Sequence, residues 1–405
     1  MTATTAMVPS TPVTSTIGWH ALRDKDGLRL LSAACQAWLH RVGNCTACRD
    51  ACPVDALLFE PSGLALLEDC LGCGRCVPAC PMGALNLPDL VHGTPSDHAP
   101  VRVDCRRVPA PLRTEVSVPC LGALDAAALL EMTSAGRGVE VLDRGWCAEC
   151  PVGGGDPVSG FPALQAIHQA TKLLTDGGWP ADLHPRRVLE PLPGDVALPV
   201  RAGAPMSRRA FFGRLAKPVR DVAATPVIPL TPPPRQPAAS PSHPSLARAR
   251  WVAAVQALPR RGTSTETVGT LGSPPPHVAL QAGSRCCNHQ GCIRLCPTGA
   301  LRPYQAGTDG ATVSGVEFDA RLCIDCGLCI RHCPEQALTR RVQDESVLDW
   351  DSPVPLTRHA SRRCEDCDTP YSVPDGQAYP GCCDPCHKSR QLARDMFYPL
   401  FATRP

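Results

Sequence analysis

Two segments of this sequence place four cysteines in the same spacing, C-x2-C-x2-C-x3-C, and a proline follows each. One segment runs from Cys70 to Pro81 and the other from Cys323 to Pro334. Three thiolates spaced in this way can surround one iron–sulfur cubane in a single tight loop, while the fourth cysteine ligates the other cluster of a pair. Glycines inside the first loop allow backbone amides to approach the sulfur atoms. The spacing therefore predicts iron–sulfur ligation, with a zinc or disulfide site as the alternative.

A shorter repeat, Cys-Pro-x-x-Ala-Leu, occurs four times in the chain. Its copies begin at Cys52, Cys80, Cys296 and Cys333. In each half of the chain, two copies bracket alternating strand-like residues with a glycine at the turn, Gly63 or Gly315. This duplicated unit resembles the two-cluster bacterial ferredoxin over about residues 32–90 and again over residues 284–342. The resemblance implies two dicluster domains that together hold up to four [4Fe-4S] clusters.

The resemblance also implies that ligands cross between the two motifs of each domain. In the first domain, one cluster takes Cys70, Cys73, Cys76 and Cys52. The other cluster takes Cys45, Cys48 and Cys80. Its motif departs from the family because no cysteine stands at position 42, and Cys35 is the expected fourth ligand. The alternative for Cys35 is a buried structural thiol.

The second domain departs from the family at the matching place. Its regular cluster takes Cys323, Cys326, Cys329 and Cys296. The other cluster is expected to take Cys287, Cys292 and Cys333, but position 289 is a histidine. Cys286 or His289 would be the fourth ligand, with a three-coordinate or smaller cluster as the alternative. Because adjacent side chains point apart in extended backbone, Cys286 and Cys287 could both bind one cubane only across a sharp bend.

The carboxy-terminal segment, residues 360–390, carries two further C-x2-C pairs separated by fifteen residues. The pairs consist of Cys364, Cys367, Cys383 and Cys386. This spacing is typical of a zinc ribbon, in which two knuckles give closed tetrahedral S4 coordination of Zn2+. Rubredoxin-like iron or free thiols are the alternatives, and Cys382 and His387 receive no role. Acidic neighbours such as Glu365 and Asp366 favour a protein-binding or stabilising role over nucleic-acid binding.

The elements that must position the remaining cysteines lie in residues 100–180, which predict a small α/β domain. Strands are expected at residues 101–104, 116–118 and 139–142, and helices at residues 125–134 and 163–174. A cysteine follows each strand: Cys105, Cys120, and the pair Cys147 and Cys150. A parallel sheet would gather these thiols at one carboxyl edge, where α/β folds place ligands. The first two strands are joined by a connection short for a helical crossover, and unligated thiols are the alternative.

The stretch from Val118 to Asp125, followed by a helix, a strand and a cysteine pair, resembles the iron–sulfur delta subunit of methanogen-type hydrogenases. That resemblance implies a [2Fe-2S] cluster on the four middle cysteines. It also implies electron delivery to a flavin-bearing heterodisulfide reductase partner.

Composition limits the other possibilities. The chain has 405 residues, enough for roughly two to four domains, but only 4% are aromatic, so each core is small. A net charge of +2 gives no electrostatic basis for binding nucleic acid or anionic membranes. Residues 1–16 lack signal-peptide character and are expected to be disordered. Because no apolar run reaches the roughly 18 residues of a membrane span, we expect a cytoplasmic protein.

Proline-rich residues 185–282 predict a linker that contains a basic helix. Ser207–Phe212 resembles a twin-arginine export signal, but it lies mid-chain, and charged residues interrupt the apolar run that should follow. The whole sequence predicts an α+β protein: two ferredoxin-like dicluster domains flank a small α/β domain, with a C-terminal zinc ribbon and Pro-rich linkers.

The predicted function is to relay single electrons between redox partner proteins. One alternative is an electron-transfer subunit of a larger oxidoreductase, and the other is a redox-sensing protein that binds partners through the zinc ribbon. No Walker loop, nucleophile constellation or carboxylate pair indicates a stand-alone enzyme or any catalytic residue.

Overall fold

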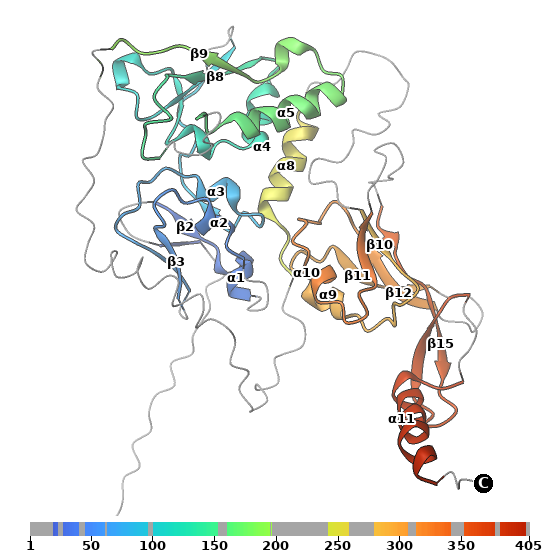
Figure 1. Cartoon of the computed structure of the whole chain (residues 1–405). Coiled ribbons are helices and arrows are strands. Elements are labelled where there is room, and N and C mark those ends of the chain that lie inside the picture. Colours follow the sequence, from blue (N-terminus) through green and yellow to red (C-terminus); the bar gives the residue numbers. More distant parts are fainter. Residues whose placement is uncertain are drawn as a thin grey trace, which may run out of the picture.

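The computed structural model describes residues 19–22, 27–39, 45–60, 63–95, 100–152, 160–194, 196, 242–258, 279–306, 313–341, 352–376 and 381–401. The expectations for residues 1–16 and for a basic helix near Ser207 lie outside this part of the chain. Within it, helices and strands combine into an α+β protein (Figure 1).

The first unit, residues 19–95, combines small antiparallel sheets with short helices that carry cysteines. One sheet has the order β1-β2-β5, and the other is the β3–β4 hairpin. The strands are β1 (His20–Ala21), β2 (Arg29–Leu30), β3 (Leu57–Glu60), β4 (Gly63–Leu66) and β5 (Leu85–Asn86). The α-helices are α1 (Gln36–Leu39), α2 (Ala47–Asp50) and α3 (Cys76–Ala79). Leu57, Met82 and Leu85 form its buried core, against which cysteines pack.

The middle unit is a four-stranded parallel sheet with the order β7-β6-β8-β9. Its strands are β6 (Val101–Cys105), β7 (Val116–Val118), β8 (Val139–Asp143) and β9 (Arg186–Leu189). Its long helices are α4 (Ala126–Thr133) and α5 (Leu164–Asp176), and Asp125 caps α4 by accepting from the Ala128 N–H at 2.7 Å. Three strands and both helices occur where the sequence predicts them, whereas β9 occupies residues assigned to the linker.

The short connection between β6 and β7 does not prevent parallel pairing. Residues 106–115 contain only a single 3-10 turn, η2 (Ala110–Leu112). The Thr114 hydroxyl donates to the carbonyl oxygen of Arg102 at 3.0 Å and so fixes the return to the sheet. A compact turn therefore replaces the usual helical crossover.

Helix α8 (Leu246–Gln256) also forms within the range predicted as linker. Trp251, Ala254, Val255 and Leu258 follow the i, i+3, i+4, i+7 spacing of a buried helical face, and all four join the core of the middle unit. Ser245 caps the helix by accepting from the Arg248 N–H at 3.0 Å. The helix lies between the middle unit and the two cysteine-rich units (Figure 1). The capping serine and the apolar spacing indicate a helix, but the proline-rich surroundings favoured the prediction of a linker.

The second unit repeats the pattern of the first and joins the carboxy-terminal hairpin through one sheet. Its elements are β10 (Ala279–Ala282), α9 (Gly291–Leu295), β11 (Leu301–Ala306), β12 (Val313–Phe318), α10 (Leu328–Arg331) and β13 (Leu338–Arg341). The carboxy-terminal segment adds β14 (Val354–Pro355), β15 (His359–Arg363), β16 (Pro370–Pro374) and α11 (Asp384–Phe401). Strand β12 pairs with β11, β14 and β15, so the sheet continues as β11-β12-β15-β16. The segment predicted as a zinc ribbon therefore extends the sheet of the second unit.

No helix in the described parts of the chain has both the length and the apolar character needed to cross a membrane.

Candidate iron–sulfur and metal centres

Site II is a cavity in the first unit that is lined by four cysteines: Cys52, Cys70, Cys73 and Cys76. Cys52 comes from one motif and the other three come from the next, as the crossed pattern implies. The remaining lining is largely apolar and includes Leu57 and Leu66. Burial, followed by the charges of neighbouring thiols, raises the pKa of Cys76. Such thiols stay protonated without metal and ligate iron as thiolates, so the donor set fits a cubane.

Site I groups the cysteines Cys35, Cys45, Cys48 and Cys80. Burial, followed by the charges of Cys80, Cys35 and Cys45, raises the pKa of the Cys48 thiol to about 12. Cys35 follows the 3-10 turn Ser32–Ala34 and packs against the core of the unit. The structure therefore brings Cys35 close to Cys45, Cys48 and Cys80, whose motif has no cysteine at position 42.

Site IV is the matching cavity of the second unit. It is lined by Cys296, Cys323, Cys326 and Cys329, together with apolar residues such as Phe318. Burial is the main cause that raises the pKa of Cys323 and of Cys329 to about 12. As in site II, one cysteine comes from the first motif and three come from the second.

Site III brings Cys286, Cys292 and Cys333 together. Burial, followed by the charge of Cys286, raises the pKa of Cys292 to about 11, and Cys333 adds to the effect. Cys287 has different surroundings, because the charges of Glu335, Asp384 and Lys388 affect its pKa in addition to that of Cys286. Its thiol donates to the Arg285 carbonyl oxygen at 3.5 Å. The structure thus brings Cys286 near Cys292 and Cys333. The sequence favoured Cys287 for this place, but the side chains of adjacent residues point apart.

The Cys-Pro-x-x-Ala-Leu repeat folds in the same way in all four sites. The residue before the alanine has a positive φ angle at Asp55 (49°), Gly83 (64°), Gly299 (68°) and Gln336 (47°). The alanine N–H then donates to the cysteine sulfur in three copies: Ala56 to Cys52 (3.2 Å), Ala84 to Cys80 (3.2 Å) and Ala337 to Cys333 (3.3 Å). Each leucine begins a strand. The repeat therefore stabilises a thiolate and anchors it to the core.

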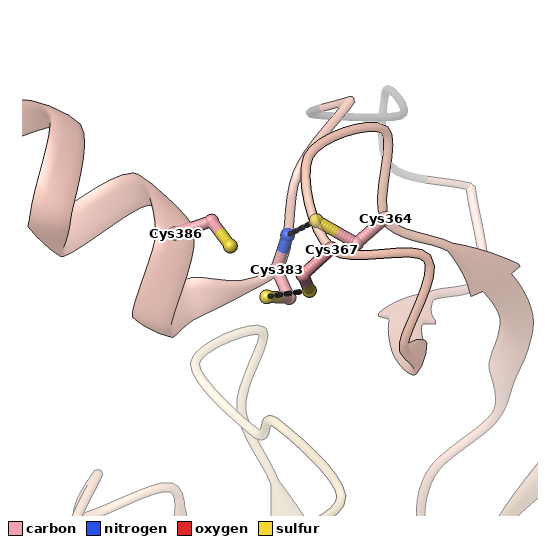
Figure 2. A group of neighbouring side chains, drawn as sticks. All are labelled: Cys364, Cys367, Cys383 and Cys386. Carbon is pink, nitrogen blue, oxygen red and sulfur yellow. Dashed lines mark hydrogen bonds between the residues drawn. The ribbon is translucent and has the colours of Figure 1, made fainter.

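The ribbon site is the group of four carboxy-terminal cysteines: Cys364, Cys367, Cys383 and Cys386 (Figure 2). Their sulfur atoms lie within 4.8 Å of one another, and those of Cys367 and Cys383 are 3.7 Å apart. Tetrahedral zinc, with Zn–S bonds of about 2.3 Å, separates its sulfurs by roughly 3.8 Å, so the spacing fits. The Cys383 N–H donates to the Cys364 sulfur at 3.3 Å and leads the effects that lower the pKa of Cys364 to about 6. Cys382 is buried nearby but lies outside the group.

The middle site lies at the carboxyl edge of the parallel sheet. Cys105 ends β6, Cys120 follows β7, and Cys147 and Cys150 follow β8. Burial, followed by the charges of Asp143 and the other three thiols, raises the pKa of Cys147 to about 12. The N–H groups of Arg107 and Gly122 donate to Cys105 and Cys120, both at 3.4 Å. Four thiols, two of which accept hydrogen bonds from backbone N–H groups, therefore share one edge of the sheet.

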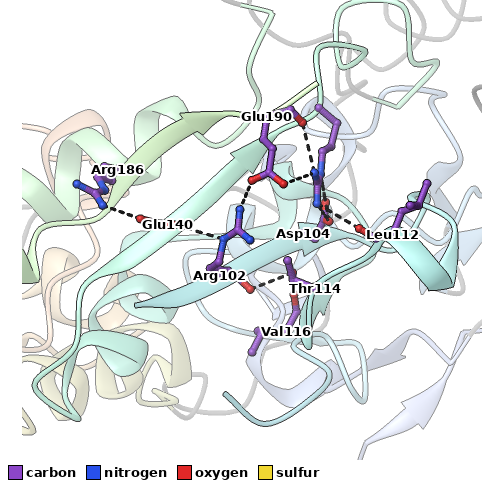
Figure 3. A network of polar contacts seen from close by, with 9 residues as sticks. Arg102, Asp104, Leu112, Thr114, Val116, Glu140, Arg186 and Glu190 are labelled. Carbon is purple, nitrogen blue, oxygen red and sulfur yellow. Dashed lines mark hydrogen bonds and ion pairs between the residues drawn. The ribbon is translucent and has the colours of Figure 1, made fainter. Parts of the chain in front are cut away.

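A buried ion pair supports this edge (Figure 3). Asp104, which directly precedes Cys105, has a fully buried side chain and accepts from Arg144 at 2.6 Å. Arg144 also donates to Glu190 Oε1 at 3.1 Å and to the Leu112 carbonyl oxygen at 3.4 Å. The pair joins β6 and β8 to the connections beside them. No local sequence pattern predicts this pair, because its two residues are forty positions apart.

The middle site adjoins site II. Arg75, between two cysteines of site II, donates to the Val152 carbonyl oxygen at 2.7 Å. A Cβ atom on Gly122 would lie 2.9 Å from the Arg75 Nε atom, which shows how closely the two loops approach. The charge of Cys120 is also one of the causes that raise the pKa of Cys73. These contacts place the two groups of thiols on either side of one interface.

A segment that we call the strap, residues 242–248, joins sites I and IV. The His243 N–H donates to the Pro297 carbonyl oxygen at 2.9 Å, and the Ser245 hydroxyl donates to the Pro81 carbonyl oxygen at 2.7 Å. These prolines directly follow the site IV ligand candidate Cys296 and the site I candidate Cys80. The strap therefore contacts one ligand loop of each cysteine-rich unit.

Close approach of the strap explains where the repeat requires glycine. A Cβ atom on Gly83 would lie 2.6 Å from the Ala247 nitrogen, and one on Gly299 would lie 3.0 Å from the Ser242 hydroxyl. The two other copies carry Asp55 and Gln336 at the same left-handed position. Glycine thus occurs in the copies that the strap covers.

Comparison with known proteins gives two family matches to parts of the chain. Residues 43–89 match the LdpA Fe-S cluster-binding domain, and residues 316–338 match a 4Fe-4S binding domain. These ranges fall in the first and second units.

Three relatives illustrate the similarity. An uncharacterized ferredoxin of Methanocaldococcus jannaschii is 36% identical over 76 residues, 18% of this chain and 41% of the relative. A tetrathionate reductase subunit of Archaeoglobus fulgidus is 50% identical over 40 residues, 9% of this chain and 19% of the relative. An iron–sulfur protein of Rhodospirillum rubrum is 30% identical over 109 residues, 27% of this chain and 50% of the relative. The chain spans half or less of each of these relatives.

These matches and the cysteine geometry support the prediction of an iron–sulfur protein of the ferredoxin type. Iron–sulfur binding domains occur in both halves of the chain, and the similar proteins include a ferredoxin, an iron–sulfur protein and a component of a reductase. Over these ranges the chain is similar to ferredoxin-type iron–sulfur proteins.

Proposed function

We propose that this protein relays electrons along a linear series of centres in the order middle site, site II, site I, site IV and site III. Each [4Fe-4S] cluster, when bound, accepts and releases one electron. The observation that carries this order is the strap, because it bonds to the Pro81 and Pro297 carbonyls and so links the ligand loops of sites I and IV.

Electrostatic effects inside the units support the other steps of the series. The charge of Cys48 in site I contributes to the raised pKa of Cys76 in site II, and the charge of Cys292 in site III contributes to the raised pKa of Cys329 in site IV. Arg75 links site II to the middle site. Each centre therefore has a neighbour on the proposed route.

The residues around each site supply position, shielding and hydrogen bonds. Sites I, II and IV take four cysteines each, and site III takes Cys286, Cys292 and Cys333. Apolar side chains line sites II and IV and exclude water, while N–H donors such as those of Ala56 and Ala84 stabilise thiolate charge. These two factors set the reduction potential of such a cluster.

The middle and ribbon sites are assigned different metals. A [2Fe-2S] cluster on Cys105, Cys120, Cys147 and Cys150 would begin or end the relay beside site II. Zn2+ at the ribbon site would hold the carboxy-terminal hairpin, because closed S4 coordination leaves no open position for chemistry.

Electrons would pass between redox partner proteins that dock at the two ends of the series. The similarity to a component of tetrathionate reductase favours a second form of this proposal, in which the chain is the electron-transfer subunit of a larger oxidoreductase. Stable co-purification with a catalytic subunit would distinguish that form from a free carrier.

Metal analysis and EPR spectroscopy on the anaerobically purified full chain test the proposal. Four cubanes and one two-iron cluster require about eighteen irons per chain, in addition to one zinc. In the fully reduced protein, neighbouring clusters should show spin–spin coupling. Replacing Cys80 should remove site I and, with it, the couplings that site I shows to sites II and IV, whereas Cys382→Ser should change neither spectrum nor iron content. Spectra of sites II and IV that keep all of their coupling in the Cys80 variant would contradict the proposed order.

A further inference from the structure

Site III departs from its counterparts in one loop, and the backbone of that loop shows how the departure is arranged. In site II, Gly72 and Gly74 have φ angles of 62° and 76°. In site IV, Asp325 and Gly327 have φ angles of 53° and 67°. In site III, the residues with the same alternation are Asn288 (54°) and Gln290 (57°). The three loops therefore turn at equivalent positions.

Backbone hydrogen bonds on both sides of these turns agree with the alignment. The N–H of Cys70 donates three residues back to Leu67 (3.2 Å), that of Cys323 to Ala320 (3.3 Å), and that of Cys286 to Gly283 (3.2 Å). After the turns, the N–H groups of Cys80, Cys333 and Cys296 donate three residues back to Val77, Ile330 and Ile293. The loop of site III thus follows the same path as the two regular loops.

This alignment assigns every position of the irregular loop. Cys286 occupies the first ligand position and Cys292 the third, six residues later as in the regular loops. The second ligand position, held by Cys73 and Cys326 elsewhere, is His289. Cys287 occupies an intervening position that is Leu71 in site II and Ile324 in site IV.

We infer that His289 is the fourth ligand of site III and that Cys287 is not a ligand. This inference rests on the proposed cubane at that site. Imidazole nitrogen is a common iron ligand, and His289 starts from the backbone position that delivers a thiolate in the other loops. His289 is exposed, so its second ring nitrogen can bond to water.

The ligand change has a predictable electronic consequence. Neutral imidazole contributes one negative charge less than a thiolate, and histidine ligation raises the potential of iron–sulfur centres. Site III would then attract electrons relative to site IV, which has four thiolates. Because site III is the last centre of the series, the histidine gives the relay a direction.

The test compares His289→Cys, His289→Ala and the matched control Cys287→Ser in the full chain. The wild-type protein should show a 14N hyperfine coupling from one cluster in pulsed EPR. His289→Cys should keep that cluster, abolish the coupling and lower the reduced-to-oxidised ratio of site III at a fixed potential at least tenfold, which is about 59 mV for one electron. His289→Ala should abolish the coupling and yield a three-iron signal after oxidation.

Cys287→Ser should leave the coupling, the potential and the iron content unchanged. An unchanged coupling and potential in His289→Ala, or loss of the site III cluster in Cys287→Ser, would overturn the assignment. Absence of iron from site III, with clusters present at sites I, II and IV, would also overturn the ligand assignment. The proposed electron transfer through sites I, II and IV would still stand.

Discussion

The guanidinium of Arg75 donates a hydrogen bond of 2.7 Å to the carbonyl oxygen of Val152. Arg75 lies between two cysteines of site II, and Val152 lies two residues after Cys150 of the middle site. One side chain therefore connects the loops of two groups of thiols from different units. Its positive charge lies where negative charge would accumulate on reduction of either centre.

Replacement of Arg75 by methionine should make the potentials of site II and the middle site more negative. A positive charge near a cluster stabilises the reduced form, which carries more negative charge, so its removal favours oxidation. Redox-titrated EPR would measure this effect as a shift of tens of millivolts. Arg75→Lys keeps the charge and is the control. Equal shifts in both variants would show that geometry, and not charge, is responsible.

Replacement of Gly83 by alanine should loosen the strap. Its Cβ atom would lie 2.6 Å from the Ala247 nitrogen, and the left-handed backbone adds strain of about 1 kcal/mol. Hydrogen exchange in helix α8 should become at least several-fold faster. Gly136→Ala is the matched control, because its φ is +75° but nothing lies within 4 Å of the added atom. Equal acceleration of α8 exchange in both variants would argue against the strap contact.

Replacement of Arg144 by methionine should destabilise the middle unit by about 3 to 5 kcal/mol, because it leaves the buried Asp104 carboxylate without its partner. The double variant Arg144→Met with Asp104→Asn should recover part of that loss. Thermal unfolding of the two single variants and the double variant measures the coupling. Strictly additive losses would indicate that the two side chains stabilise the unit independently.

Replacement of Asp319 by asparagine should reveal a pH-dependent contribution to the second unit. Burial acts to raise the pKa of Asp319, but hydrogen bonds and charge from Arg321 lower it overall from 3.8. The ionised carboxylate therefore stabilises the fold above about pH 4, and this contribution is lost as pH falls through the lowered pKa. The difference in unfolding temperature between wild type and variant should shrink as pH falls below 3.8. A difference that stays constant with pH would rule out this role for the carboxylate.

Removal of metal from the ribbon site should loosen strands β15 and β16. The four sulfurs within 4.8 Å of one another repel as thiolates unless a cation neutralises them. Cys364→Ser should lose one zinc per chain and speed hydrogen exchange across the hairpin. The buried Cys382 lies outside the sulfur group, so Cys382→Ser should retain the metal. Zinc content that is unchanged in Cys364→Ser would contradict this assignment.

Local sequence patterns predicted the candidate cluster ligands and much of the local structure. The C-x2-C-x2-C spacing acts within one loop, so it indicated the cysteines that line sites II and IV without knowledge of the fold. The strands and helices of the middle unit were also predictable, because β-branched runs and the Asp125 cap act over a few residues. The proposal of electron transfer follows from the same local patterns.

Tertiary structure decided what depends on residues distant in the chain. Helix α8 forms inside a proline-rich range because Trp251 and Val255 pack against a core more than sixty residues away in the sequence. The proposed choice of Cys286 over Cys287 depends on the left-handed turns at Asn288 and Gln290, since a turn sets which of two adjacent side chains faces the site. The proposed order of the centres rests on contacts between units, which no local spacing encodes.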